Sequence, residues 1–432
     1  MNRKLSIPGA ISAALTTMIV ATALFAAPGA NAAWTVKGGG FGHGIGMSAY
    51  GSYGMAEHGW SYRKILRHYY QHTRIRELRK ARTVRVLLNI DPGNVYFSGA
   101  ERACGVDLTE SRTYGAKLAG NRVRLIRQNG RKLADCGRRL RTENDGRGVF
   151  KGLGRYRGGV EVVPTGSSSG SLNAINAVSV NAYVKGVIPN ESIPSWPMEA
   201  LRTQAVASRS FALTGGVDGN GFDLYNDTRS QVYGPISTEY RRTNRAASQT
   251  SKQVVTFKKK VALTVFSASS GGHTENVENV WFGDPVPYLQ GVRDPFDDVS
   301  PYHRWKVTFT NSDMNGRLAA YVKGRLKKVK ITQYGVSKRV IWARLYGTGG
   351  MSKIRGDSLQ YALGLNDRLV FSIKPGAKAS AASSLLPEAE PAQILPAGIG
   401  TILPSTEPRS APATCLLYTS DAAAEPPSVD LG

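Results

Sequence analysis

The chain has 432 residues and a formal net charge of +25, from 56 Lys and Arg against 31 Asp and Glu. This length is enough for two domains, or for one large domain with a tail, each able to bury a real core. After the N-terminal segment, no stretch is long and apolar enough to span a bilayer, which excludes a protein with several membrane-spanning helices.

Residues 1–32 have the pattern of a secretory signal peptide. Arg3 and Lys4 form a basic start, and an apolar stretch follows over residues 11–27. Residues 30–32 read A-N-A, which fits cleavage before Ala33. A membrane anchor is the alternative, but the apolar stretch is short and no stop-transfer pattern follows it. We therefore expect a secreted or wall-located protein without a stable membrane anchor.

The expected export of the protein limits the partners that its net positive charge can indicate. Outside the membrane, a basic protein meets anionic polymers such as teichoic acids, peptidoglycan carboxylates and anionic lipids. Nucleic acid is the usual partner for this charge, but we do not expect it for an exported chain. The plainer interpretation is that most Lys and Arg residues only keep a secreted protein soluble.

Residues 33–78 are glycine-rich and then helical. The segment 38–46 reads GGGFGHGIG. Ser48 is placed to cap a short helix that ends at Gly59, and Ser61 to cap a second one. Apolar residues recur on one stripe of that second helix, at Tyr62, Ile65, Leu66 and Tyr69. We expect this block to pack on the core of the protein.

Residues 79–170 predict a β-rich subdomain, because short β-prone runs alternate with Gly, Asn and Asp turns. Cys104 and Cys136 both fall in this region. In an exported chain they predict a disulfide, which closes a loop and adds about 3–4 kcal/mol in the entropic model. Two separate buried thiols are the alternative. Cys415 is not included, since residues 415–425 resemble a translated sequencing adapter.

Residues 171–375 predict the main core. Residues 177–188 are interpreted as a strand that leads into a turn framed by Pro189 and Pro194, with Glu191 inside the turn. A helix then begins near Pro197 and ends at Gly215. It has a small apolar stripe, formed by Leu201, Ala205, Ser208 and Ala212.

A strand pair is expected over 254–267, around a turn of three lysines at 258–260. From residue 376 to 432 the chain is rich in Ala, Pro and Ser, which is typical of a disordered tail. Helices and strands thus both contribute to the predicted core. The expected fold class is α+β, with a helix and sheet core and a β-rich insertion.

Several blocks of the chain resemble the stage II sporulation protein D and LytB amidase-enhancer family, called SpoIID/LytB below. Residues 183–191 and 196–209 resemble its Y-x-x-G-V-x-P-x-E and W-P-x-E-A-L-x-x-Q-A-V-A-x-R signatures. Residues 228–234 resemble its S-Q-V-Y-x-G element, and 266–274 its S-S-G-G-x-T element. The G-H-G-x-G-M-S element at 42–48 usually follows the others, whereas here it comes first, as in a permuted chain.

The resemblance implies a lytic transglycosylase that cleaves glycan strands between N-acetylmuramic acid and N-acetylglucosamine. It makes Glu191 the catalytic acid and base. A glycosidic oxygen must be protonated as its bond breaks, which needs a carboxyl that is still protonated near neutral pH. Ile193 and Trp196 are placed to desolvate Glu191. The alternative for Glu191 is a carboxylate that only makes local hydrogen bonds in its turn. The other acid of the signature, Glu199, is interpreted as structural.

The same blocks supply candidate substrate-binding residues: His43, Arg209, Gln231, Tyr233, Ser269, Ser270, His273 and Thr274. Arg209 could hold a carboxylate, or could be only a charge on the helix surface. A lone His is more often structural, and Tyr233 could instead belong to the core. The glycines around His43 are expected to let the backbone pass close to the catalytic turn; a dinucleotide loop is rejected for lack of a strand–loop–helix context.

No cofactor or metal is expected, because Cys104 and Cys136 lack metal-site spacing with any His. The expected partners are peptidoglycan strands, anionic wall polymers and, as a further candidate, a cell-wall amidase. The LytB side of the family keeps a second function open, that of a binding module that enhances an amidase without chemistry. A plain hydrolase is a third hypothesis, although hydrolases normally pair two carboxylates.

Overall fold

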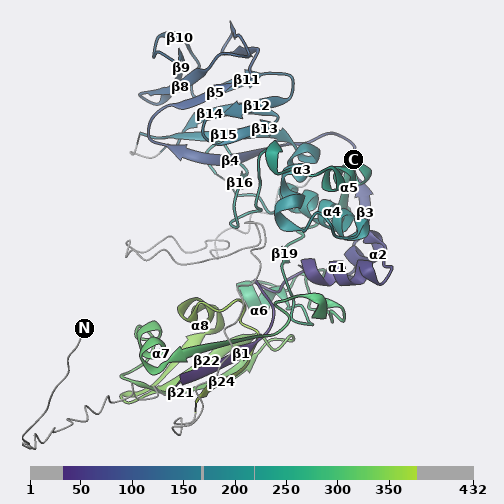
Figure 1. The fold of residues 1–432 in the computed structure, drawn as a ribbon, viewed down its shortest axis with the longest axis vertical. Helices are drawn as coiled ribbons and strands as arrows, with labels where there is room; N and C mark the ends of the chain where they lie inside the picture. Colours follow the sequence, from purple (N-terminus) through teal and green to yellow (C-terminus); the bar gives the residue numbers. More distant parts are fainter. Residues whose placement is uncertain (1–32, 167–169, 218, 377–432) are drawn as a thin grey trace, which may run out of the picture.

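The computed structural model describes residues 33–166, 170–217 and 219–376, in a mixed α+β structure that confirms the predicted fold class. Two β-sheets lie at one end of the molecule, a group of helices in the middle and a smaller unit of strands and helices at the other end (Figure 1). The expected signal peptide and, from residue 377, the expected tail lie outside the described residues.

The β-rich region consists of two sheets packed on a shared core. Alternate residues of the strands point into it, so that Val123, Leu125, Val160 and Val162 are all buried. One sheet has the order β10 (Lys132–Asp135), β9 (Arg122–Arg127), β8 (Tyr114–Ala119), β5 (Val95–Ser98), β12 (Arg147–Phe150), β13 (Gly154–Arg157). The other has the order β16 (Leu224–Tyr225), β4 (Thr83–Asp91), β15 (Leu172–Ser179), β14 (Gly159–Pro164), β11 (Leu140–Glu143), β6 (Arg102–Ala103), β7 (Val106–Asp107).

The predicted disulfide is confirmed. Cys104 lies in the tight turn between β6 and β7 and is bonded to Cys136, which directly follows β10; their Cα atoms are 5.2 Å apart. The bond joins the outer ends of the two sheets, where the strands are short. Its closure of a 32-residue separation contributes about 3–4 kcal/mol in the entropic model.

The predicted strand over 177–188 is confirmed only as far as Ser179 and is wrong from Val180 onward. Strand β15 ends at Ser179, and the helix α3 (Val180–Glu191) follows at once, with the Ser179 hydroxyl accepting a hydrogen bond from the Ala182 N–H. The physical reason is the spacing of the apolar side chains, which repeats every three to four residues and places one buried stripe on a helix. That stripe consists of Val180, Tyr183, Val184, Val187 and Ile188. Glu191 is therefore the last residue of a helix.

The helix α4 (Met198–Thr214) is the centre of the middle region, and its end at Gly215 confirms the predicted boundary. Its predicted apolar stripe is buried, and the Ala and Ser residues in it let neighbouring helices approach closely. Around it pack α3, α5 (Arg241–Gln249), β17 (Gln253–Phe257) with its partners β18 (Lys260–Val261) and β3 (Arg74–Glu77), and the helices α1 (Ala49–Glu57) and α2 (Tyr62–Tyr69). The caps predicted for α1 and α2 are present, since Ser48 and Ser61 accept from Gly51 N–H and Lys64 N–H.

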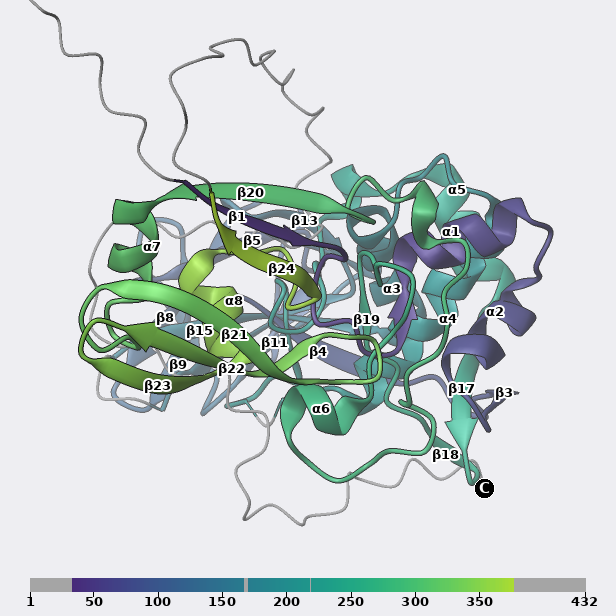
Figure 2. The same cartoon turned by 90° about the horizontal axis from the view of Figure 1, so that it is seen from below.

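The N-terminal block connects all parts of the molecule. Its first strand, β1 (Ala33–Gly38), lies between β20 (Trp305–Thr310) and β24 (Val370–Pro375) in a three-stranded sheet (Figure 2). Its next strand, β2 (Met47–Ser48), pairs in parallel with β19 (Phe266–Ser267). The first and last described strands are thus neighbours, which is the arrangement that a permuted chain requires.

The remaining unit has its own apolar core, which includes Trp34, Leu345 and Leu359. It contains the sheet of β1 and a second antiparallel sheet in the order β21 (Leu326–Tyr334), β22 (Val340–Gly347), β23 (Gly350–Arg355). The helices α7 (Asn311–Arg317) and α8 (Gly356–Leu363) cover this core, and α6 (Val277–Trp281) lies between the unit and the middle region (Figure 1). Two short 3-10 helices, η1 (Ile236–Thr238) and η2 (Asp297–Val299), complete the elements.

Candidate functional site

Glu191 occupies the C-terminal end of α3, where the chain leaves the helix through the extended residue Ser192. Its Oε1 accepts a hydrogen bond of 2.7 Å from the Val232 N–H. Burial raises the pKa of Glu191 to about 8, and the hydrogen bond from Val232 opposes this only in part. In the part of the chain that the structure describes, Glu191 forms no ion pair. The carboxyl group is therefore mostly protonated near neutral pH, as a general acid requires.

The loop that holds Glu191 is fixed by two tyrosines. The Tyr183 hydroxyl donates to Gln231 Oε1 at 3.1 Å, and the Tyr233 hydroxyl donates to Asn176 Oδ1 at 2.8 Å. The two tyrosine rings lie 4.9 Å apart. A side chain at Gly186 would come within 2.5 Å of the Tyr233 ring, so the glycine of the signature is needed for this packing. These contacts fix the position of the Val232 N–H.

The structure places Gln231 next to Glu191 and Tyr233 in the core. Gln231 Nε2 is buried and has no hydrogen-bond partner among the described residues, so it is a donor that remains free. Tyr233 is only 4% exposed and packs between Tyr183 and Tyr156. It therefore has no open face on which a sugar could stack, and we assign it to the core.

Arg209 has a structural role in this geometry. Its side chain is fully buried and donates to Asn181 Oδ1 at 2.8 Å and to the carbonyls of Gln253 and Ala247 at 3.0 and 3.2 Å. Burial lowers its pKa to about 10. The expected contact with a carboxylate is absent from the structure that is described, because backbone carbonyls from α5 and β17 take the guanidinium instead.

Glu199 is also structural, as predicted from its place in the first turn of α4. Its Oε2 accepts from the Tyr62 N–H at 2.7 Å, at the first residue of α2, and its Oε1 pairs with Arg202. The carboxylate thus stabilises the start of one helix and ties it to the start of another.

A second group of polar residues surrounds the loop 269–272, and its centre is an acid that the sequence did not indicate. Asp297 is fully buried and accepts five hydrogen bonds. Its donors are the hydroxyls of Ser48 and Ser269, the N–H groups of Ser270 and Gly271, and His303 Nδ1. Ser269 and Ser270 are therefore both buried and engaged with aspartates, since Ser270 Oγ donates to Asp294 at 2.7 Å.

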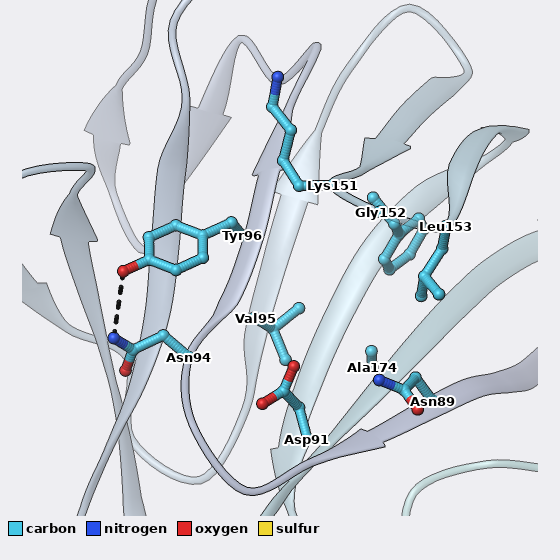
Figure 3. Close-up of a pocket in the computed structure, with 10 residues that line it drawn as sticks. Asn89, Asp91, Asn94, Val95, Tyr96, Lys151, Gly152, Leu153 and Ala174 are labelled. Carbon is cyan, nitrogen blue, oxygen red and sulfur yellow. Dashed lines mark hydrogen bonds between the residues drawn. The ribbon is translucent and has the colours of Figure 1, made fainter.

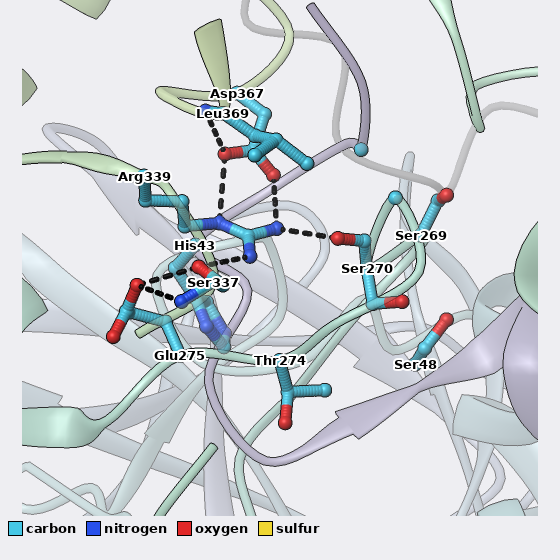
Figure 4. A network of polar contacts seen from close by, with 12 residues as sticks. His43, Ser48, Ser269, Ser270, Thr274, Glu275, Ser337, Arg339, Asp367 and Leu369 are labelled. Carbon is cyan, nitrogen blue, oxygen red and sulfur yellow. Dashed lines mark hydrogen bonds and ion pairs between the residues drawn. The ribbon is translucent and has the colours of Figure 1, made fainter. Parts of the chain in front are cut away.

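His43 and Thr274 lie near the buried ion pair of Arg339 and Asp367 (Figure 4), and the carbonyl of His273 contacts Arg339 as well. Burial and the positive charge of Arg339 lower the pKa of His43 to about 4, so this ring is neutral. Arg339 also donates to the carbonyls of His273 and Ser270. A second carboxylate, Glu275, accepts from Ser337 and further supports the network.

The glycines of the G-H-G block pass close to this network and not to Glu191, which corrects the expectation from the sequence. A side chain at Gly44 would come within 2.1 Å of Arg339 Cζ, and one at Gly46 within 2.2 Å of the Val265 carbonyl. Directly after the block, Tyr50 packs against aromatic side chains of other segments. Tyr50 lies 5.1 Å from Trp196 and 6.4 Å from Tyr302, between ring centroids.

The predicted site residues thus form two groups. Glu191 and Gln231 belong to one. The other contains His43, Ser269, Ser270, His273 and Thr274, and within the described ranges no hydrogen bond or ion pair joins it to Glu191. A pocket of about 260 Å³ in the β-rich region, near Asn94 and Tyr96, is lined by none of these residues (Figure 3).

Two further observations concern metals and membranes. Among the described residues, no group of three or more His, Cys, Asp or Glu is placed to hold a metal ion. Within the same residues, every helix is too short or too polar to cross a bilayer.

Comparison with known proteins shows a similarity for the region around Glu191. Residues 168–257 match the model of the stage II sporulation protein family, SpoIID. Over this segment the chain is similar to the SpoIID/LytB family. The matched segment contains Glu191, Arg209, Gln231 and Tyr233, whereas the loop 269–272 and Arg339 lie beyond it.

Three relatives illustrate the extent of the similarity. The chain is 36% identical over 169 residues to an uncharacterized protein of Brachyspira hyodysenteriae, which covers 38% of this chain and 45% of the relative. It is 36% identical over 132 residues to an amidase enhancer of Bacillus subtilis, with 31% and 17% covered. It is 27% identical over 210 residues to stage II sporulation protein D of Bacillus subtilis, with 45% and 60% covered. The chain thus spans less than two thirds of each relative.

Proposed function

We propose that the protein acts in the cell wall as a lytic transglycosylase on peptidoglycan glycan strands, with Glu191 as the single acid and base. The observation that carries this proposal is a carboxyl group whose pKa is raised to about 8 by burial, held by one backbone N–H in the family's signature segment. Export to the wall, expected from the first 32 residues, is part of the proposal.

The hydrogen bond to Val232 fixes which oxygen carries the proton. An N–H needs an acceptor, so Oε1 is the carbonyl-like oxygen of the neutral carboxyl and Oε2 carries the hydrogen. In the proposed reaction Oε2 gives its proton to the glycosidic oxygen, and the bond from that oxygen to the muramic acid C1 breaks. The muramic acid 6-hydroxyl then bonds to C1 and returns its proton to Glu191. The product is a 1,6-anhydro end, and no water is consumed.

One acid is enough for this reaction. A hydrolase normally uses a second carboxylate, and the other acid of the signature, Glu199, is committed to Tyr62 and Arg202.

A second candidate is an accessory role without chemistry. The relative named amidase enhancer has 36% identity to this chain, and a wall-binding module that stimulates an amidase would fit that name. The two candidates differ in the fate of the glycan bond, which makes them separable.

The test is to incubate the protein with glycan strands freed of stem peptides and to analyse the ends by mass spectrometry. We expect 1,6-anhydro ends with the wild type, and a loss of about 10²–10⁴ in rate for Glu191→Gln, because the variant lacks the proton. Glu199→Gln is the matched control, since it should change stability and leave the product unchanged. Reducing ends would indicate a hydrolase, and intact strands that still bind would favour the accessory role.

A further inference from the structure

The outer face of the sheet β21-β22-β23 is an uncompensated row of positive charges. Lys330 lies opposite Arg344, and Arg344 lies opposite Lys353, so three cations stand side by side across three strands. All three are exposed. We call Lys330, Arg344 and Lys353 the basic row. In the described part of the chain, the side chains of these three residues form no ion pair and no hydrogen bond.

The fold does not need this charge. Residues 326–355 contain no Asp or Glu, and like charges directly opposite each other destabilise a sheet. The inner face of the same strands is apolar and buried, with Ala343, Leu345 and Ile354 packed into the core of the unit. The basic row is therefore not a by-product of packing, because exposed positions would accept neutral residues equally well.

Aromatic side chains accompany the basic row. Trp342 and Tyr346 flank Arg344 on the same face of β22, and both are partly exposed. The Lys353 ammonium lies 4.0 Å from the centre of the Trp342 ring, which holds this cation against the sheet. Tyr346 lies between Lys328 and Met351 in the register and leaves part of its ring open to solvent. Flat rings between cations suit a chain of sugar rings that carries negative groups.

We propose that this sheet face binds an acidic polysaccharide, with the basic row on its carboxylates or phosphates and Tyr346 against a sugar ring. The choice of a polysaccharide over a nucleic acid rests on the proposed function, whereas the binding of a polyanion rests only on the sheet. The sheet lies at the end of the molecule opposite the β-rich sheets (Figure 1), away from Glu191 on α3. It would hold the protein on its polymer while Glu191 acts elsewhere on the strand.

The test uses the full chain carrying Glu191→Gln, so that cleavage does not affect binding. The probes are denuded peptidoglycan strands, a sugar-free glycerol phosphate polymer and a short DNA duplex, at low and moderate salt. Substitution of Lys330, Arg344 and Lys353 by Gln should weaken binding to the strands by about tenfold or more. The matched control replaces three exposed cations elsewhere, Arg241, Lys258 and Lys259, by Gln and should change binding by less than about twofold.

The aromatic contact is tested separately. Tyr346→Ala should weaken binding to the strands and leave binding to the glycerol phosphate polymer unchanged. If the basic-row variant binds the strands as tightly as the control variant, the inference is overturned. If only DNA binding depends on the sheet, the polysaccharide assignment is overturned as well. Cleavage of short strands by Glu191-containing protein reports the proposed function independently, since its absence would leave the binding result intact.

Discussion

The Val232 N–H donates to Glu191 Oε1 at 2.7 Å, across 41 residues of sequence. This contact joins the end of α3 to the segment 228–234. It also holds one of the two carboxyl oxygens of Glu191 in place. A charged carboxylate would gain more from the bond than a neutral one, yet burial outweighs it and the pKa rises to about 8. Because the pKa of Glu191 is raised, both the activity and the stability of the protein should depend on pH.

Activity should fall as the pH rises past about 8. The proposed first step needs the protonated carboxyl of Glu191, and that form is lost through its raised pKa. The measurement is the rate of anhydro-end formation between pH 5 and 10. A rate that is constant across pH 8, with the protein still folded, would contradict the role given to Glu191.

Glu191→Gln should make the protein more stable at pH 7, by about 1–3 kcal/mol. The folded-state pKa is above the unfolded value of 4.5, so the native state holds a proton that the unfolded state releases. The stability contributed by this proton is complete below about pH 4.5 and is lost as the pH rises toward 8. Gln cannot ionise and still accepts from Val232.

Urea unfolding of both proteins at several pH values between 5 and 8 checks this linkage. The gain from Glu191→Gln should grow with pH over that range. A gain that does not change with pH would show that the substitution acts by another route.

Local features of this fold were predictable because they depend on neighbours in sequence. Residues within one turn of a helix end determine where that helix begins or stops. The sequence therefore predicted the caps Ser48 and Ser61 and the end of α4 at Gly215. The helix α3 was missed because its β-branched residues outweighed their helical spacing. Glu191 could be chosen because the other acid of the signature, Glu199, falls in the first turn of a helix, where a structural role is expected.

Long-range contacts could not be predicted in the same way. Arg209 is buried because carbonyls 38 and 44 residues away point at it. Asp297 lies at the centre of the loop 269–272 because three separate segments meet there, and its sequence context has no motif. Arg339 is also outside the family blocks, and only the fold brings it to His43. These residues could have been found only from the packing of distant segments.

Asp297→Asn and Asp294→Asn should have opposite effects. Asp297 accepts five hydrogen bonds through its two carboxyl oxygens. In Asp297→Asn one of these oxygens becomes an NH₂ group, which cannot accept the hydrogen bonds that the surrounding groups donate. We expect a loss of about 2–4 kcal/mol. Burial and the charge of Asp297 raise the pKa of Asp294 to about 7, above the unfolded value of 3.8, so Asp294→Asn should stabilise the protein already at pH 6 and somewhat more at pH 8. Thermal unfolding at both pH values measures this, and equal losses for the two variants would refute it.

Gly44→Ala should destabilise the protein more than Gly59→Ala. Both glycines have positive φ, 74° and 76°, so both substitutions carry a backbone cost of about 1 kcal/mol. A methyl group at Gly59 meets no atom within 4 Å, whereas at Gly44 it would lie 2.1 Å from Arg339 Cζ and disturb the ion pair with Asp367. The expected difference is more than about 2 kcal/mol. Denaturant midpoints of the two variants give the comparison, and equal values would mean that the block does not pack on Arg339.

Arg344→Thr should stabilise the protein by about 0.2–1 kcal/mol. Arg344 lies between Lys330 and Lys353 in the register, so its removal relieves repulsion on both sides, and Thr suits an exposed strand position. The gain should shrink at high salt, because screening weakens the same repulsion in the wild type. Arg122→Thr is a control on another exposed strand, where the opposite residue is Ala119. If both substitutions change the free energy of unfolding equally at low salt, the basic row carries no stability cost, and the reason for expecting a bound polyanion there is removed.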